Sequence, residues 1–224
     1  MAVQRVRRAG RALQIIRAGA VGLLVTLACD ARAQQCEPDF PGSRELGEQI
    51  ATRQCAACHG PAGISIATQI PNLAGQLPEY LVKQLEAFRA SPGGKPLRPS
   101  PVMSPLVAAL SKSDVAALAA FYSTLTPSTS SARDPARLAL GRSIYTQGNP
   151  EQGLPACVTC HRPTGSGIRP DFPRLAGQSA DYVENQLSAW MAVRGKPGKL
   201  MTMIVPHLQP AERQAVADYV AQLH

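Results

Sequence analysis

A five-residue pattern of cysteine and histidine occurs twice in this chain, as CAACH at residues 55–59 and as CVTCH at residues 157–161, an offset of 102 residues. Cys-x-x-Cys-His is typical of covalent c-type haem attachment. Two thiols separated by two residues can each form a thioether with one vinyl group of the porphyrin, and the next histidine then lies under the ring. The sequence therefore predicts two covalently bound haem c groups.

The residues predicted to hold the haems come directly from the two motifs. They are the thiols of Cys55, Cys58, Cys157 and Cys160 and the imidazoles of His59 and His161. A structural zinc site needs four ligands, and each half has only one Cys-x-x-Cys. A thioredoxin-like dithiol does not need the adjacent histidine. Four thiols pooled around one metal stay an alternative, which the rest of the repeat disfavours.

The repeat extends well beyond the motifs. The hexapeptide PNLAGQ at residues 71–76 matches PRLAGQ at residues 173–178 at the same offset, and Tyr80 then matches Tyr182. Farther on the offset falls to 98, and a turn-rich segment at residues 148–153 lengthens the second copy before its motif. Matched blocks separated by insertions are the signature of duplicated domains.

The two ends and the linker give the predicted boundaries. A basic start, a short apolar run and an Ala31-Arg32-Ala33 cleavage site predict a secretory signal peptide over residues 1–33. We expect a first copy at 34–126, a Ser/Thr/Pro-rich linker at 127–135 and a second copy at 136–224. An uncleaved anchor and a lipid anchor at Cys29 remain alternatives. Cys36 is an odd thiol without an assigned role.

Charge gives little support for a nucleic-acid partner. The whole chain carries a formal net charge of +8, but six arginines and one aspartate lie in the leader, so the mature chain has 17 basic and 14 acidic residues. The predicted protein is exported to the periplasm and does not bind nucleic acid. An excess of basic residues in the second copy suggests a face that steers an acidic partner, formed by Arg162, Arg169, Arg174, Arg194, Lys196 and Lys199.

Apolar residues recur at helical spacing, and strand patterns are nearly absent, so the predicted fold class is all-α. Ser111 and Asp114 are spaced as a capping box. The expected helices cover residues 44–54, 79–90 and 112–125 in the first copy and residues 136–147, 180–193 and 211–223 in the second.

The sixth ligand of each iron is expected from a methionine, whose thioether raises the reduction potential relative to a second histidine. Met103 lies in a Pro-rich loop before the closing helix of the first copy. Its counterpart is Met201, seven residues before Leu208 as Met103 is before Leu110. Met203 is the fallback for Met201, and His207 a remote third candidate. We also expect the carbonyls of Pro71 and Pro173 to accept hydrogen bonds from the proximal histidines.

Taken together, the paired motifs, the Pro-x-Leu-Ala-Gly-Gln blocks, the Tyr-x-x-x-Gln-Leu helices that follow and the methionine loops resemble the cytochrome c4 family, dihaem proteins built from two tandem class I-like cytochrome c domains. The resemblance implies four thioethers at the motif cysteines and axial pairs His59/Met103 and His161/Met201. It also implies periplasmic electron transfer, with each domain a few helices wrapped around one haem.

The expected function is that of an electron-transfer protein rather than an enzyme. Protein ligands on both sides of iron leave outer-sphere transfer as the favoured chemistry. The expected partners are redox proteins of a respiratory chain, with a cytochrome complex or dehydrogenase upstream and a terminal oxidase downstream, and peripheral membrane association stays open. The alternatives are a tightly bound electron-accepting subunit of a periplasmic dehydrogenase and, less favoured, a dihaem enzyme such as a peroxidase.

Overall fold

The computed structural model describes residues 41–90, 94–129, 131–194 and 199–224. Within these ranges the regular structure is helical, without a β-strand and with two isolated bridges, Asn149–Leu154 and Ile168–Phe172. The all-α prediction is therefore confirmed. Both copies belong to one folded unit. No helix among the described residues is long and apolar enough to span a membrane. The expected signal peptide, Cys29 and Cys36 lie outside the described residues.

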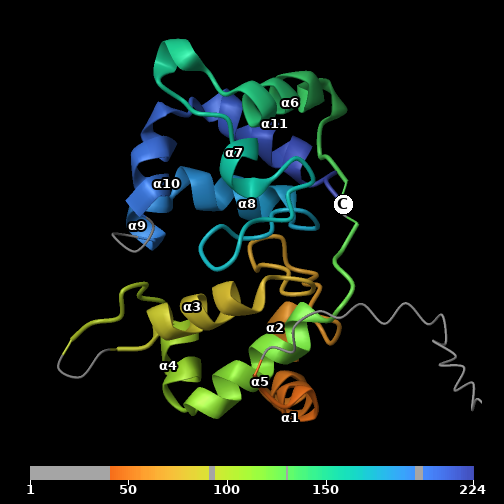
Figure 1. Ribbon diagram of the computed structural model, residues 1–224, viewed down its shortest axis with the longest axis vertical. Coiled ribbons are helices and arrows are strands. Elements are labelled where there is room, and N and C mark those ends of the chain that lie inside the picture. Colours follow the sequence, from red (N-terminus) through yellow and green to blue (C-terminus); the bar gives the residue numbers. More distant parts are fainter. Residues whose placement is uncertain (1–40, 91–93, 130, 195–198) are drawn as a thin grey trace, which may run out of the picture. The chain divides into compact units, whose positions relative to one another are not determined.

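Over residues 41–90 and 94–126, the first copy contains five α-helices and a π-helical turn (Figure 1). They are α1 (Arg44–Ile50), the π-helical turn η1 (Ala51–Cys55), α2 (Ala56–His59), α3 (Pro78–Phe88), α4 (Met103–Ala108) and α5 (Lys112–Ser123). Pro78 occupies the first turn of α3, where its missing N–H costs nothing. The Ser111–Asp114 capping box at the start of α5 is present as predicted.

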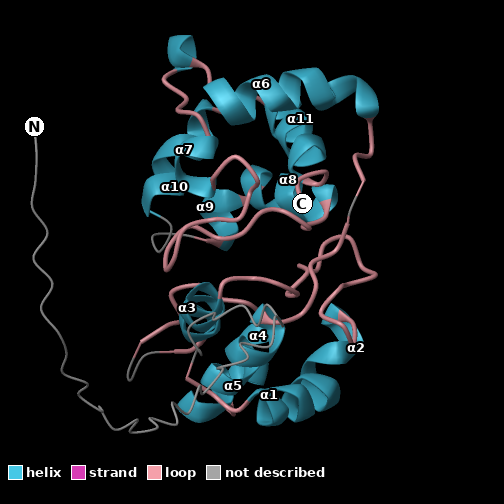
Figure 2. Ribbon diagram, turned by 45° about the vertical axis from the view of Figure 1, so that its right-hand side comes forward, coloured by secondary structure: helices cyan, strands magenta, loops and turns pink. Residues whose placement is uncertain are grey.

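The second copy repeats this order with additions (Figure 2). Its elements are η2 (Pro135–Arg137), α6 (Leu138–Gln147), η3 (Pro150–Gln152), α7 (Val158–His161), α8 (Ala180–Ser188), α9 (Trp190–Val193), α10 (Lys199–Ile204), η5 (Val205–His207) and α11 (Pro210–Val220). The turn-rich insertion is the 3-10 turn η3, closed by the bridge between Asn149 and Leu154.

In each copy the first and last long helices cross at a glycine. A Cβ built on Gly47 of α1 would lie 2.0 Å from the carbonyl oxygen of Ala117 in α5, and one on Gly141 of α6 would lie 2.0 Å from that of Ala215 in α11. The two backbones therefore touch, and only glycine fits. Gly47 and Gly141 are 94 residues apart, whereas the two haem motifs are 102 residues apart. The second copy therefore has eight more residues between its glycine and its motif.

Two apolar cores accompany the two crossings. In the first copy Leu81, Leu118 and Phe121 belong to one buried cluster, against which Cys55 packs. In the second copy Ile144, Val183 and Val220 belong to the other, against which Cys157 and Met201 pack. The first cysteine of each motif thus lies at the edge of its core. A large apolar group bonded to that cysteine would extend the same core.

The structure changes several helix boundaries. The helix expected over residues 44–54 is α-helical only to Ile50 and then widens to the π-helical turn η1. The helix expected over 180–193 breaks at Ala189, whose φ of −103° and ψ of 15° leave the helical region. Both methionines expected in loops begin or lie in short helices, Met103 in α4 and Met201 in α10. Helices this short are set by packing rather than by periodicity.

The segment expected as a linker, residues 127–135, is hydrogen-bonded to the second copy through Arg133. The backbone N–H and the Nε of Arg133 donate to Asp218 at 3.0 and 3.1 Å, and Asp218 is fully buried. The guanidinium also donates to Asp181 at 2.6 Å and Glu184 at 2.7 Å. Arg133 therefore contacts α8 and α11 and fixes where the second copy begins.

Candidate haem sites

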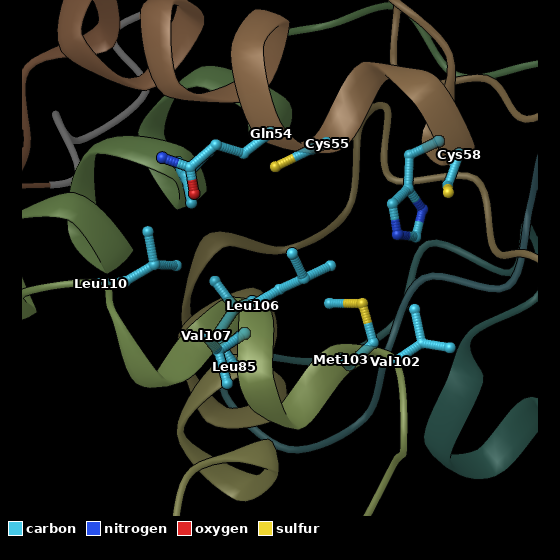
Figure 3. Close-up of a pocket in the computed structure, with 11 residues that line it drawn as sticks. Gln54, Cys55, Cys58, Leu85, Val102, Met103, Leu106, Val107 and Leu110 are labelled. Atoms are coloured by element: carbon cyan, nitrogen blue, oxygen red, sulfur yellow. The ribbon is translucent and has the colours of Figure 1, made fainter.

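The first candidate site is a cleft lined by the CAACH segment and by α3, α4 and α5. Its lining includes Cys55, Cys58, His59 and Met103. Leu85, Val107, Leu110 and Leu118 supply most of the remaining, apolar wall. Figure 3 shows the thioether of Met103 on the side of the cleft opposite the segment that carries Cys55 and Cys58.

The turn of helix that carries each motif orients its histidine. Cys55 ends η1 and His59 ends α2, so cysteine and histidine side chains leave one short helical stretch. In the second copy Cys157 precedes α7 and His161 ends it. The next residue, Gly60 or Arg162, has φ of +76° or +68°, which ends the helix and turns the chain away from the site.

Both histidines are buried and held by one nitrogen only. His59 and His161 are 8 % and 7 % exposed. Their Nδ1 atoms lie 3.0 Å from the carbonyl oxygens of Pro71 and Pro173, as expected from the sequence. Within the described ranges no hydrogen bond involves either Nε2 atom. A carbonyl acceptor at Nδ1 fixes the tautomer that leaves Nε2 with a lone pair for a metal.

Burial also shifts the acid–base chemistry of these groups. It lowers the pKa of His59 and of His161, only partly opposed by the bonds to the proline carbonyls, which favours the neutral imidazole that ligates metals. It raises the pKa of Cys55, and that of Cys157 to about 11. A reactive dithiol needs a lowered thiol pKa, so the shifts argue against the thioredoxin-like alternative.

The zinc alternative also fails on geometry. No group of three or more His, Cys, Asp or Glu side chains in the described part of the chain is arranged to hold a metal ion. The four motif cysteines form no disulfide with one another, and since they do not gather into such a group, the two motifs lie at separate sites. What each site offers is a pair of thiols, one neutral imidazole and an apolar wall, the donor set of covalent haem.

The two methionines of the second copy differ sharply in exposure. Met201 is partly buried and packs against the second core. Met203, two residues later in α10, is 69 % exposed. His207, the remote candidate, is exposed in the turn η5.

The basic face expected around the second site is only partly present. Arg194 is 8 % exposed and donates to Gln84 of the first copy, so it cannot meet an external partner. The guanidinium of Arg169 lies 3.5 Å from the carboxylate of Glu79. Lys196 lies outside the described residues.

Two pairs of residues beside the sites were not singled out from the sequence. Gln76 and Gln178, the last residues of the repeated hexapeptide, contact the backbone next to the other copy's proximal proline. Tyr122 and Tyr145 lie beside the first cysteine of their motifs, Tyr122 from the last helix of its copy and Tyr145 from the first. An identical polar residue kept in both copies was the available signal for the glutamines.

Comparison with known proteins agrees with this geometry. The family described as Cytochrome c matches residues 45–126 and again 138–224. Cytochrome c4 of Thiocapsa roseopersicina is 40 % identical over 186 residues, covering 81 % of this chain and 93 % of that protein. The thiosulfate dehydrogenase electron acceptor of Thiomonas intermedia strain K12 is 40 % identical over 172 residues, 75 % of this chain and 77 % of that protein.

The fold comparison leads to the same family. The crystal structure of reduced recombinant cytochrome c4 from Pseudomonas stutzeri superposes with a TM-score of 0.74 at 33 % identity, covering 82 % of this chain and all of that one. Two Cys-x-x-Cys-His motifs in two matching domains account for two covalently bound haem c groups and for electron transfer as the function. The chain belongs to the cytochrome c4 family of dihaem electron-transfer proteins.

Proposed function

We propose that this protein is a periplasmic carrier that exchanges single electrons with other redox proteins, with His59 and Met103 as axial ligands in the first copy and His161 and Met201 in the second. The observation that carries the proposal is the first cleft, where His59 and Met103 both line the space beside Cys55 and Cys58. When bound, the haem supplies an iron that alternates between the ferric and ferrous states.

The residues of the chain then set how that iron behaves. Cys55 and Cys58 would hold the ring through thioethers against the apolar wall of the cleft. The Pro71 carbonyl oxygen, 3.0 Å from Nδ1, holds the His59 ring. The Met103 sulphur would favour ferrous iron and would fill the position at which a substrate would bind. With protein ligands in both positions, outer-sphere transfer would be favoured over catalysis.

The choice of Met201 over Met203 is supported by their surroundings. A ligand to a buried group has to lie against the core, as Met201 does. A side chain that is 69 % exposed, as that of Met203 is, faces solvent. The repeat supports the same choice, because Met201 is the counterpart of Met103.

Exposed apolar residues at the rim of the first cleft support short-range exchange with a protein partner. Val102 is 59 % and Leu106 44 % exposed, and both line the cleft. Leu200, the counterpart of Val102, is 55 % exposed. Apolar side chains around a redox group, left open to solvent, suit a transient interface that desolvates on contact.

Export and partners complete the proposal. The N-terminal 33 residues have the pattern of a signal peptide, which delivers the chain to the compartment where haem is attached. The upstream partner is a cytochrome complex or dehydrogenase and the downstream partner a terminal oxidase. Among the basic residues expected to steer an acidic partner, Arg162 is exposed, whereas Arg194 is not. Equal exchange rates at low and high salt would exclude steering.

A second candidate is a fixed electron-accepting subunit of a dehydrogenase. It is favoured by the resemblance to a protein named for accepting electrons from thiosulfate dehydrogenase. Co-purification of the exported chain with a catalytic polypeptide, stable on gel filtration, would support the subunit. A free monomer supports the carrier.

The carrier proposal is tested by the ligand shell of iron. We expect a redox-titrated visible spectrum with two covalent haems and, in the oxidised protein, the red-end absorption band of methionine ligation. The reduced protein should bind carbon monoxide slowly or not at all. Rapid carbon monoxide binding at either haem would instead indicate an open site and an enzyme such as a dihaem peroxidase.

A further inference from the structure

The peptide group between Pro71 and Asn72 is bonded on both sides. Its carbonyl oxygen lies 3.0 Å from Nδ1 of His59 in the same copy. Its N–H donates to Oε1 of Gln178, which belongs to the second copy, at 2.8 Å. One amide therefore joins the proximal histidine of the first haem to a side chain of the other haem domain.

The same arrangement occurs in the opposite direction. The carbonyl oxygen of Pro173 lies 3.0 Å from Nδ1 of His161. The N–H of the same peptide group, from Arg174, donates to Oε1 of Gln76 in the first copy at 2.8 Å. The two bonds from peptide N–H to glutamine are equal in length, so the cross-connection is reciprocal.

Each glutamine is held so that its oxygen faces the peptide N–H. Nε2 of Gln178 donates to the carbonyl of Asn72 at 3.0 Å, and Nε2 of Gln76 donates to the carbonyl of Arg174 at 2.8 Å. Both side chains are 8 % exposed. Two bonds to one residue, away from water, fix the orientation of the amide.

Hydrogen bonds in series polarise one another. When a peptide N–H donates to a strong acceptor, electron density moves toward its own carbonyl oxygen, which becomes a better acceptor. A better acceptor draws the Nδ1 proton of the imidazole and makes Nε2 a stronger donor to iron. A stronger donor stabilises the ferric state and lowers the reduction potential.

We propose that Gln178 tunes the reduction potential of the haem on Cys55 and Cys58, and Gln76 that of the haem on Cys157 and Cys160. Each acts from the other copy through the Pro71–Asn72 or Pro173–Arg174 peptide group. The two glutamines are positioning residues for the partner haem. The inference rests on the proposed ligation by His59 and His161.

The test uses the whole dihaem protein and the pair of variants Gln178→Met and Gln76→Met, which keep length and remove the bonds. In the reduced protein, NMR reports the Nδ1–H resonance of each proximal histidine. Redox titration followed by the haem methyl resonances reports each potential, and a Met103→His variant assigns the two haems. Both measurements distinguish a weaker hydrogen bond from a loosened fold.

We expect a crossed result. Gln178→Met moves the His59 Nδ1–H resonance upfield and raises the potential of the first haem, and Gln76→Met does the same for His161 and the second. The ratio of reduced to oxidised haem should change by up to about tenfold, where tenfold is ~59 mV for one electron. The other haem should change by less than half as much.

Gln186→Met is the matched control. Gln186 accepts from Arg194 at 2.7 Å and from Arg98 of the first copy at 3.4 Å, but it touches neither proximal peptide group. It should leave both Nδ1–H resonances unmoved. The proposal is overturned if the crossed variants move both haems alike, move the haem of their own copy, or move neither.

Failure of the ligation itself would look different. If the wild-type protein lacked the red-end methionine band or bound carbon monoxide rapidly, the axial ligands would be wrong before any glutamine was changed. With the band present and carbon monoxide excluded, an uncrossed result counts against the glutamines alone.

Discussion

At the scale of single residues, the proposed methionine ligands give the sharpest prediction. Replacing Met103 or Met201 with histidine exchanges a thioether for an imidazole, which lowers the reduction potential of that haem and abolishes its share of the red-end band. Potentiometric titration with visible spectra measures both. Met203→Leu is the control, since Met203 is 69 % exposed and should change neither. A lost band in Met203→Leu would make that residue the ligand.

Arg162 is the one non-glycine residue with positive φ in the described part of the chain, at +68°. Its counterpart in the first copy is Gly60, at +76°. A side chain with this backbone costs of order 1–3 kcal/mol, partly offset because glycine is more flexible in the unfolded chain.

Arg162→Gly should therefore raise the free energy of unfolding, by about 1 kcal/mol, measured by denaturant titration of the holoprotein. The matched control is the opposite kind of change, from glycine to a residue with a side chain, at the counterpart position Gly60. A Cβ on Gly60 would lie 2.0 Å from the carbonyl oxygen of Ile64, so Gly60→Ala should be strongly destabilising. A lower stability of Arg162→Gly would mean that the arginine side chain, and not the backbone, decides this position.

The chemical roles of the residues in and near the motifs could be predicted from the sequence, but the directions in which side chains farther away point could not. The two cysteine–histidine motifs and the proline acceptors followed from spacing and from the repeat. The orientation of Gln76 and Gln178 did not, because a glutamine in a matched block looks the same whether it faces solvent or another copy.

At the scale of elements, the helix crossings at Gly47 and Gly141 are the most restrictive packing. A methyl group at either position would overlap a carbonyl oxygen of the facing helix at 2.0 Å. Gly47→Ala or Gly141→Ala should lower the free energy of unfolding by about 3 kcal/mol, the upper range for overpacking, and loosen the haem in that copy.

The check is a pair of denaturation curves followed at the haem absorption. Leu140→Ala is the control on the same helix, because Leu140 is 44 % exposed and its loss should cost little. If Gly141→Ala is no less stable than Leu140→Ala, the helices have room to separate and the crossing does not constrain the fold.

Periodicity predicted the long helices and missed the short ones. α3, α5 and α11 begin within one residue of the expected positions, because proline and a capping box mark their starts. The helices α4 and α10 contain six residues each. Segments of that length have no periodic signal, and the buried valines that anchor them, Val107 within α4 and Val205 directly after α10, do not mark a helix in the sequence. The π-helical turn η1 has no signature in composition at all.

At the scale of the whole molecule, the contact between the copies brings two arginine side chains, Arg98 and Arg194, close to each other. Arg194 donates to Gln84 and to Tyr80 Oη at 3.3 Å in the first copy, and to Gln186 in the second. Arg98 donates to Gln84 at 2.8 Å. Burial and the charge of Arg194 lower the pKa of Arg98. Among the described residues no carboxylate forms an ion pair with either arginine.

The two arginines should therefore differ in what their loss costs. Arg194→Met removes one donor from each of the partly buried Gln84 and Gln186 amide oxygens and from the Tyr80 hydroxyl, and should cost about 3 kcal/mol of unfolding free energy. Either change ends the repulsion between the two guanidinium groups, but Arg98 makes two of the bonds, at 2.8 and 3.4 Å, against four from Arg194, so Arg98→Met should cost less. Denaturant titration of the two variants decides, and equal losses would mean that the number of hydrogen bonds does not set the cost.

The sequence predicted two domains but not how they meet. Three residues of the contact had a local interpretation: Tyr80 and Gln84 as parts of a helix, and Arg194 as part of a basic face. Burial of Arg194 at 8 % exposure is a property of the second copy packed on the first. Such a property has no counterpart in composition or spacing within one copy.

The reciprocal glutamine contacts also bear on ancestry. Gln76 binds residue 174 and Gln178 binds residue 72, and these positions are counterparts in the repeat. When residue i of one body binds j of the other, and j of the first binds i of the second, the contact is that of an isologous homodimer. A single-haem domain carrying this hexapeptide would hold both halves of the contact, as a self-complementary interface between two identical subunits requires.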